Sequence, residues 1–229
     1  MKRILILSGL AFSLAAARAD LVIQQKIEGA MMNGTVTVKV KGNQVRTDIP
    51  SSPQGSMSTI LDLNSGDQVM LMHQEKMAMK IPGARVKQMA ENMRKERADA
   101  GTNGPPAKFT DTGKTEQVGE YNAEIYTWSG PDGEKQTVWV AKNFPDYSKI
   151  KTDMDKLEES PMAKISRGSA PDASTLPGMV VKTQTEMNGQ KVTSTLVSAK
   201  EQTVDASVFE TPKDYHEMTA PAVAPPPNQ

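Results

Sequence analysis

The sequence predicts an α+β fold that is mostly antiparallel β-sheet, with about ten to eleven strands and two helices. Short runs in which apolar and polar residues alternate recur along most of the chain. Pairs such as Gly42-Asn43 and Asn188-Gly189 separate these runs and are typical of tight hairpin turns. Only two stretches, one after Pro82 and one after Pro145, change to the spacing of an amphipathic helix.

Residues 1–19 have the composition of a secretory signal peptide. Lys2 and Arg3 precede an apolar run of about fourteen residues, which ends at Ala17-Arg18-Ala19. A membrane-spanning helix needs roughly twenty apolar residues, so a retained N-terminal anchor is the less favoured alternative. We expect cleavage between Ala19 and Asp20, and a mature chain that is periplasmic or secreted and has no transmembrane segment.

Charge and composition narrow the class of protein. Loss of Lys2, Arg3 and Arg18 leaves 24 basic residues against 27 acidic ones, whereas nucleic-acid-binding domains usually carry a clustered basic excess. The sequence contains no cysteine, which excludes disulfides, thiol catalysis and thiolate metal sites. We therefore expect one domain, residues 20–218, that is monomeric, binds no nucleic acid and relies on its core for stability.

Six strands are predicted before the first helix. In residues 35–41 three valines alternate with threonine and lysine, which indicates one buried face and one face in water. Asn33-Gly34 is expected to form the hairpin turn that precedes this strand. The predicted strands are residues 21–28, 35–41, 44–49, 57–63, 68–72 and 76–81. The last two form a hairpin, and His73 is expected in its turn, exposed to solvent.

The first helix is predicted between Pro82 and Gly101, residues that suit a helix start and the region beyond a helix end. Val86, Met89, Ala90 and Met93 fall at helical spacing and form a narrow apolar stripe, so the helix should lie on the surface of a sheet. Residues 99–108 contain two glycines and two prolines and indicate a mobile loop.

The second half repeats the pattern of strands around one helix. Asp146 is expected to cap a helix whose apolar stripe is Ile150, Met154 and Leu157 and which Pro161 ends. A polar loop, residues 166–178, follows. The predicted strands are residues 109–118, 121–129, 134–141, 179–187 and 190–198. The tail, residues 219–229, is rich in proline, has no apolar pattern and is expected to be disordered.

Several segments resemble a known family. They are GTVTVKVKGNQVRTDI (34–49), TILDLNSGDQVMLMHQEKMAMKI (59–81), GEYNAEIYTW (119–128), VWVAKNFP (138–145) and VFETPKDY (208–215). The chain is similar to a family of uncharacterised exported bacterial domains related in shape to the periplasmic lipoprotein carriers LolA and LolB. The resemblance implies a curved, half-open β-barrel covered by two helices. It supports ligand binding only by analogy, and no functional residue of the carriers can be matched to this chain.

The parts that most enzymes need are missing from the sequence. His73 and His216 are the only histidines, and no nucleophile elbow, phosphate loop, dinucleotide turn or zinc-protease helix motif occurs. Residues 62–67 superficially resemble a calcium loop, but they lack the expected ligands and are better explained as a hairpin turn. We therefore expect a protein that is not an enzyme and has no cofactor. The sequence does not exclude acid-base catalysis by two carboxylates that the fold brings together from distant positions.

Four methionines gather in residues 69–82, and three interpretations of them remain open. They can fill the space between the sheet and the first helix together with Met89 and Met93, since methionine adapts to irregular gaps. They can bind copper(I), with Met70, Met72, His73, Met77 and Met79 as ligands. They can also line an apolar binding surface, to which Trp128 and Trp139 on a hairpin expected nearby would contribute.

The favoured hypothesis is an exported binding protein that holds a lipid or another apolar ligand, or an envelope partner, on the concave side of its sheet. The residues predicted to line that surface are Met70, Met72, Met77, Met79, Met89, Met93, Trp128 and Trp139. The rival hypotheses are a periplasmic copper(I)-binding protein and a structural interaction module of the cell envelope.

Overall fold

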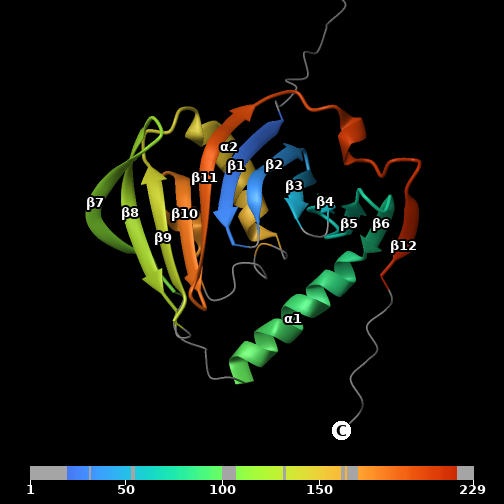
Figure 1. Ribbon diagram of the computed structural model, residues 1–229, viewed down its shortest axis with the longest axis horizontal. Coiled ribbons are helices and arrows are strands. Elements are labelled where there is room, and N and C mark those ends of the chain that lie inside the picture. Colours follow the sequence, from blue (N-terminus) through green and yellow to red (C-terminus); the bar gives the residue numbers. More distant parts are fainter. Residues whose placement is uncertain are drawn as a thin grey trace, which may run out of the picture.

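The computed structural model describes residues 20–30, 32–52, 55–99, 107–130, 133–160, 163 and 170–220. The described chain forms one sheet, two α-helices and two 3-10 turns (Figure 1). The elements are β1 (Leu21–Gly29), β2 (Asn33–Lys41), β3 (Gln44–Ser52), β4 (Gly55–Asp62), β5 (Gln68–Met72), β6 (Met77–Ile81), α1 (Gly83–Asp99), β7 (Thr110–Val118), β8 (Tyr121–Ser129), β9 (Lys135–Ala141), α2 (Tyr147–Glu159), η1 (Ala173–Thr175), β10 (Met179–Met187), β11 (Gln190–Glu201), η2 (Ala206–Phe209) and β12 (His216–Thr219).

The sheet has twelve strands in the order β12-β6-β5-β4-β3-β2-β1-β11-β10-β9-β8-β7. Every neighbouring pair is antiparallel except β12 and β6, which are parallel. Within the described part of the chain, β12 and β7 are the two edges, and the sheet curves into an open arch (Figure 1). The predicted α+β fold with a half-open barrel is therefore confirmed. The eleven predicted strands all form, and β12 is the additional one.

Of the three residue pairs predicted to form tight hairpin turns, two are confirmed and one is wrong. Gly42 has a φ of 59°, and Asn188 and Gly189 have φ of 53° and 74°, as tight hairpin turns require. Asn33 and Gly34 do not form a turn, because they lie inside β2 opposite Glu28 and Ile27. The Asn33 amide instead exchanges hydrogen bonds with the backbone of Gly29 (2.9 and 3.2 Å), which closes a longer connection.

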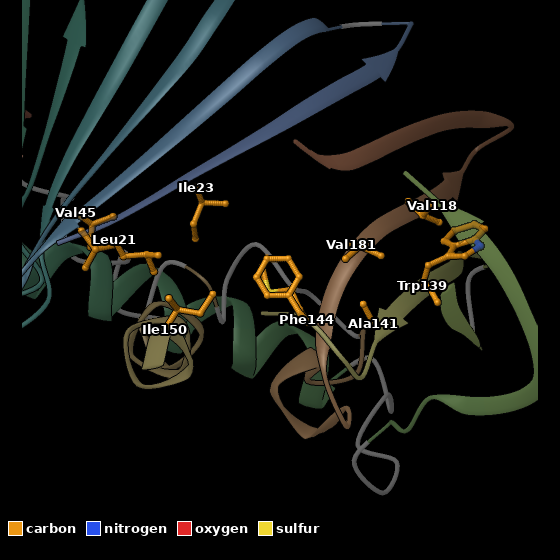
Figure 2. Close-up of a cluster of buried hydrophobic side chains, with 12 residues drawn as sticks. Leu21, Ile23, Val45, Val118, Trp139, Ala141, Phe144, Ile150 and Val181 are labelled. Carbon is orange, nitrogen blue, oxygen red and sulfur yellow. The ribbon is translucent and has the colours of Figure 1, made fainter. Parts of the chain in front are cut away.

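Helix α2 packs in the middle of the arch. Ile150 of α2 and Phe144 just before it belong to one buried cluster with Leu21, Ile23 and Val45. Figure 2 shows these side chains converging from the strands and from the helix. We call the sheet face that carries Leu21 and Ile23 the inner face. The cluster extends to β8, β9 and β10, so α2 joins the two halves of the arch.

The opposite, outer face is covered by residues 204–220, which we call the C-terminal segment. Val204 and Phe209 form a buried cluster with Val22, Ile60 and Leu71. The prediction that one face of residues 35–41 lies in water is therefore confirmed only at Thr35, which is exposed. The lysines of this face are only partly exposed, because the C-terminal segment covers that face and Lys41 binds Asp20 (2.7 Å) and the Val204 carbonyl (2.9 Å).

The termini and the start of α2 bear on three further predictions. Residues 1–19 and 221–229 lie outside the described residues, so the predicted signal peptide and most of the predicted tail are not placed. The predicted tail starts at Thr219, but Thr219 ends β12 and the Ala220 amide donates to the Lys80 carbonyl (2.9 Å). The prediction that Asp146 caps α2 with its side chain is wrong. Its φ of 54° turns the carboxylate toward Lys149 (2.6 Å).

Candidate functional site

The methionines of β5 and β6 lie side by side in the predicted hairpin. Met70 is opposite Met79, and Met72 is opposite Met77. Alternation along the strands sends Leu71 and Ala78 to the outer face, where both are fully buried. Counting the cross-strand pairs from Leu21 through Val40, Val45 and Leu61 to Gln68 places the four methionines on the inner face. All four are partly exposed.

Helix α1 does not bury its share of the predicted methionine cluster. Met89 keeps 45% of its surface exposed and Met93 is partly exposed. None of the six methionines of the predicted set belongs to a buried cluster of the described residues. Val86 is the buried residue of the α1 stripe. The interpretation in which β5, β6 and α1 form one methionine-filled core is therefore not supported.

His73 lies in the turn, as predicted, but it is only partly exposed rather than fully exposed, and it does not join the methionines. It points to the outer face, where its Nε2 lies 2.7 Å from Ser58 Oγ and its Nδ1 lies 2.6 Å from the Tyr215 hydroxyl. Ser58 donates its single proton to Asp48 (2.7 Å), so Nε2 of a neutral His73 donates to Ser58 and Nδ1 accepts from Tyr215. Both ring nitrogens are occupied, so the copper set that includes His73 does not assemble.

The hydrogen-bond network around His73 holds the C-terminal segment against the sheet. Arg46 donates to Asp48 (2.6 Å), to Ser58 (2.9 Å) and to the Val208 carbonyl (2.8 Å). Burial alone would raise the pKa of Asp48, but hydrogen bonds from Lys39, Ser58 and Arg46 outweigh burial and hold that pKa below its ordinary value. Ser58 is 1% exposed and fully bonded, so this Ser-His pair is a structural joint.

The two tryptophans do not lie on the same face of the sheet. Trp128 is opposite Gln136 and Trp139 is opposite Ile125, and this register puts the two indoles on opposite faces of β8 and β9. Trp139 is 6% exposed, donates to Glu116 (2.8 Å) and lies under the ammonium group of Lys182 (4.2 Å). The expectation that their hairpin lies near the methionines is also wrong, because β4, β3, β2, β1, β11 and β10 separate β5 from β9.

A cavity of about 530 Å³ lies between α2 and the strands β8 to β10. Trp128 is the one residue of the predicted set that lines it. Its apolar lining includes Phe109, Trp128, Val138, Tyr147, Met154, Met179, Val180 and Met187. Its polar lining includes Gln25, Gln136, Asp155, Glu158, Thr183 and Thr185. This volume falls in the range of natural ligand sites, about 300–1,000 Å³.

A second recess of about 660 Å³ continues from the first. The two share Phe109, Ala170 and Pro171, so they adjoin beside η1. Tyr126 lines the second recess and donates to Glu124 (2.9 Å). Burial, followed by the hydrogen bond to Glu124, raises the pKa of Tyr126 to about 12, so the phenol stays protonated and neutral.

A family model matches residues 21–215, and its description is "Domain of unknown function (DUF4412)". The chain belongs to this family. The match confirms the predicted membership of an uncharacterised domain family. No curated protein matches the chain.

Solved structures resemble this DUF4412 chain in fold. An uncharacterised conserved protein from Thermus thermophilus matches with a TM-score of 0.52 at 7% identity, over 89% of this chain and 91% of that one. The lipoprotein LppX of Mycobacterium tuberculosis matches with a TM-score of 0.42 at 9% identity, over 83% and 90%. A LolA superfamily protein from Nitrosomonas europaea matches with a TM-score of 0.32 at 9% identity, over 84% and 90%. Only the first score exceeds 0.5, and at 7% identity it establishes the shared fold alone.

Sequence reasoning missed most of the cavity in this DUF4412 domain. Met179 and Met187 gave no signal beyond strand alternation, and Met154 could be assigned only to the apolar stripe of its helix.

Neither α1 nor α2 has the length and hydrophobicity that a membrane-spanning helix needs.

Proposed function

We propose that this protein is a non-enzymatic binding protein, exported to the periplasm or secreted, that holds an apolar ligand such as a lipid acyl chain. The ligand lies in the cavity between α2 and the strands β8 to β10. One observation carries the proposal, namely a recess of about 530 Å³ on a curved sheet with a predominantly apolar lining. Export itself is supported by the signal-peptide pattern in residues 1–19.

The lining of the cavity favours a flexible apolar guest. Three methionines, Met154, Met179 and Met187, come from α2 and from the two ends of β10, and their thioether chains can adapt to guests of different shape. Met187 is 51% exposed at the rim. Each CH₂ group that a guest transfers from water into such a cavity contributes about 0.8 kcal/mol.

The polar atoms of the cavity set the orientation of the guest. The side-chain oxygen of Gln136 is buried and has no hydrogen-bond partner among the described residues. A buried acceptor without a donor costs about 1–3 kcal/mol, so a ligand hydroxyl or amide that reaches this side chain removes a cost. The charged residues of the lining are the carboxylates Glu134, Asp155 and Glu158, which disfavour an anionic guest, and Asp155 is paired with Lys151 (2.6 Å). We therefore favour a neutral amphiphile that carries a hydrogen-bond donor.

The two tryptophans allow a contact-dependent test. Trp128 lines the cavity and Trp139 faces the other side of the sheet. We expect a monoacylglycerol with a brominated chain to quench the fluorescence of the wild-type protein and of a Trp139→Phe variant. A Trp128→Phe variant should lose most of the quenching, because its remaining indole does not reach the cavity. Equal quenching in the two variants would contradict the proposed site.

Affinity gives a second test. Met154→Gln places an amide in the apolar lining, and we expect it to weaken binding of the same probe by about tenfold or more, because burying an unpaired amide costs about 1–3 kcal/mol. Met89→Gln on α1, where the side chain is 45% exposed, is the matched control and should leave binding unchanged. Native mass spectrometry of the protein purified from its export compartment should show a co-purified lipid in the wild type.

A further inference from the structure

The methionine rows of β5 and β6 extend over four neighbouring strands. Met57 of β4 is opposite Met72, Met72 is opposite Met77, and Met77 is aligned with His216 of β12. These four residues form the first row. Met70, Met79 and Met218 form the second row in the same way. Six methionines and one histidine therefore share the inner face at this end of the arch.

An ion pair confirms which residues of β12 share that face. Lys80 and Glu217 contact each other (2.6 Å) on the outer face, together with Ala78. Because side chains alternate along a strand, His216 and Met218 point to the same side as Met77 and Met79. Both are exposed, and the imidazole of His216 makes no hydrogen bond among the described residues. His73, in contrast, uses both of its ring nitrogens.

We propose that this face binds a soft monovalent metal ion, copper(I), through Met72, Met77 and His216, with Met79 and Met218 as adjoining thioethers. Directly opposite residues on neighbouring strands have Cβ atoms about 4.5–5.5 Å apart, so flexible methionine side chains from β5 and β6 can converge on one ion together with the imidazole of β12. Thioethers and imidazole are the ligand types that copper(I) prefers, and no carboxylate stands in either row to favour a hard cation.

The site lies apart from the cavity of the proposed function. Helix α2 packs on β1 and β3, between the methionine rows and the cavity lined by β8 to β10. The metal proposal therefore stands or falls independently of ligand binding in that cavity.

Competition for copper(I) tests the proposal. Purified protein is titrated with copper(I) without oxygen, in competition with bathocuproine disulfonate, and we expect one ion per chain. His216→Ala and Met77→Leu should each weaken binding by about tenfold to a hundredfold, a range known even for outer-shell partners of metals. Met89→Leu removes an exposed methionine of α1 and should leave the copper(I) affinity unchanged. Equal affinity in all four proteins would overturn the proposal.

A spectroscopic measurement on the wild-type protein tests the same site without relying on the stability of any variant. Silver(I) is a soft ion that is not oxidised or reduced under these conditions, so it can stand in for copper(I). It is added to wild-type protein whose methionine methyl groups carry carbon-13. The resonances of Met72 and Met77 should shift first, followed by those of Met79 and Met218, while that of Met187 stays in place. A parallel shift of all methionine resonances would mean adventitious thioether binding and would overturn the site.

Discussion

The hydroxyl of Ser58 fixes the orientation of the His73 side chain. Ser58 lies on β4 directly opposite Leu71 of β5, so its side chain shares the outer face with Asp48 and Arg46. Its oxygen donates to Asp48 and accepts from Arg46 and His73, which uses all of its hydrogen-bonding capacity. The imidazole is thereby turned away from the methionines and toward Tyr215 of the C-terminal segment.

Removing the Tyr215 hydroxyl should loosen the C-terminal segment. In a Tyr215→Phe variant the Nδ1 acceptor of His73 loses its donor, and we expect a loss of about 1–2 kcal/mol in the free energy of unfolding. Hydrogen exchange should accelerate mainly at the amides of His216 and Ala220, which bond to the carbonyls of Lys76 and Lys80. Tyr121→Phe, at a partly exposed tyrosine, is the control. Unchanged exchange at β12 would show that the bond does not hold this segment.

Asp48 should make stability depend on pH in the acid range. Its pKa is lower in the folded protein than in the unfolded chain, so its contribution is fully present above the unfolded pKa, near 3.9. The contribution is lost as the pH falls through the lower, folded pKa. We expect Asp48→Asn to reduce the free energy of unfolding at neutral pH by about 1.5–3 kcal/mol and to flatten its fall in acid.

Asp214 provides the control for this pH dependence. A hydrogen bond from Lys76 lowers its pKa too, but the pair is exposed to solvent. Chemical unfolding at a series of pH values should therefore show little difference between Asp214→Asn and the wild type. If Asp48→Asn kept the wild-type pH profile, Asp48 would not be a source of acid sensitivity.

At the scale of elements, the junction between β6 and α1 depends on Gly83. A Cβ at this position would overlap the carbonyl oxygen of Ser65 in the turn before β5. The Gly83 amide donates to the Asp67 carboxylate (2.7 Å), and this bond lowers the pKa of Asp67. The start of α1 is thus held against the β4-β5 turn, and no side chain fits between them.

Gly83→Ala should destabilise this junction although alanine favours helices. The gain in helix propensity is at most about 1 kcal/mol, whereas forcing atoms into a filled space costs about 1–3 kcal/mol. We expect a net loss in the free energy of unfolding, measured with denaturant. Ala84→Met, at the exposed neighbouring position, should stay within about 0.5 kcal/mol of the wild type. A Gly83→Ala protein as stable as the wild type would contradict the close packing.

The strands that alternate clearly could be predicted from the sequence, together with both helices and the Gly42-Asn43 and Asn188-Gly189 turns. The predicted β5-β6 hairpin was also confirmed. β12 could not be predicted, because all four of its residues are exposed and its partner lies far away along the chain. The same long-range pairing brings His216 to the methionines. The position of Trp128 in a cavity depends on α2 and η1, which no local pattern connects to β8.

At the scale of the whole molecule, the C-terminal segment forms one edge of the arch and covers part of its outer face. It covers Ile60 and Leu71 and adds β12 beside β6. Without β12, the free edge of β6 would offer unpaired amides and carbonyls to another chain.

Two truncations separate the role of β12 from that of the residues that follow it. A chain that ends at Asp214 loses Tyr215 and β12, and we expect lower thermal stability and association through the β6 edge, detected by light scattering. A chain that ends at Ala220 keeps every described contact and should behave as the full-length protein does. An Asp214 truncation that stays as stable and as dispersed as the Ala220 truncation would argue against an edge-protecting role.

The position of β1 in the middle of the sheet has a consequence for the order of folding. Leu21 pairs with Val40 on one side and with Glu201 on the other. If the predicted signal peptide directs export with the N-terminus first, β1 emerges at the start of translocation and can pair with β2 at once. Its second neighbour, β11, arrives only near the end. Such long-range pairing folds slowly and leaves strand edges open in the meantime. The first strand to cross is therefore among the last to be completed, and the interval in between is when the chain is most exposed to aggregation.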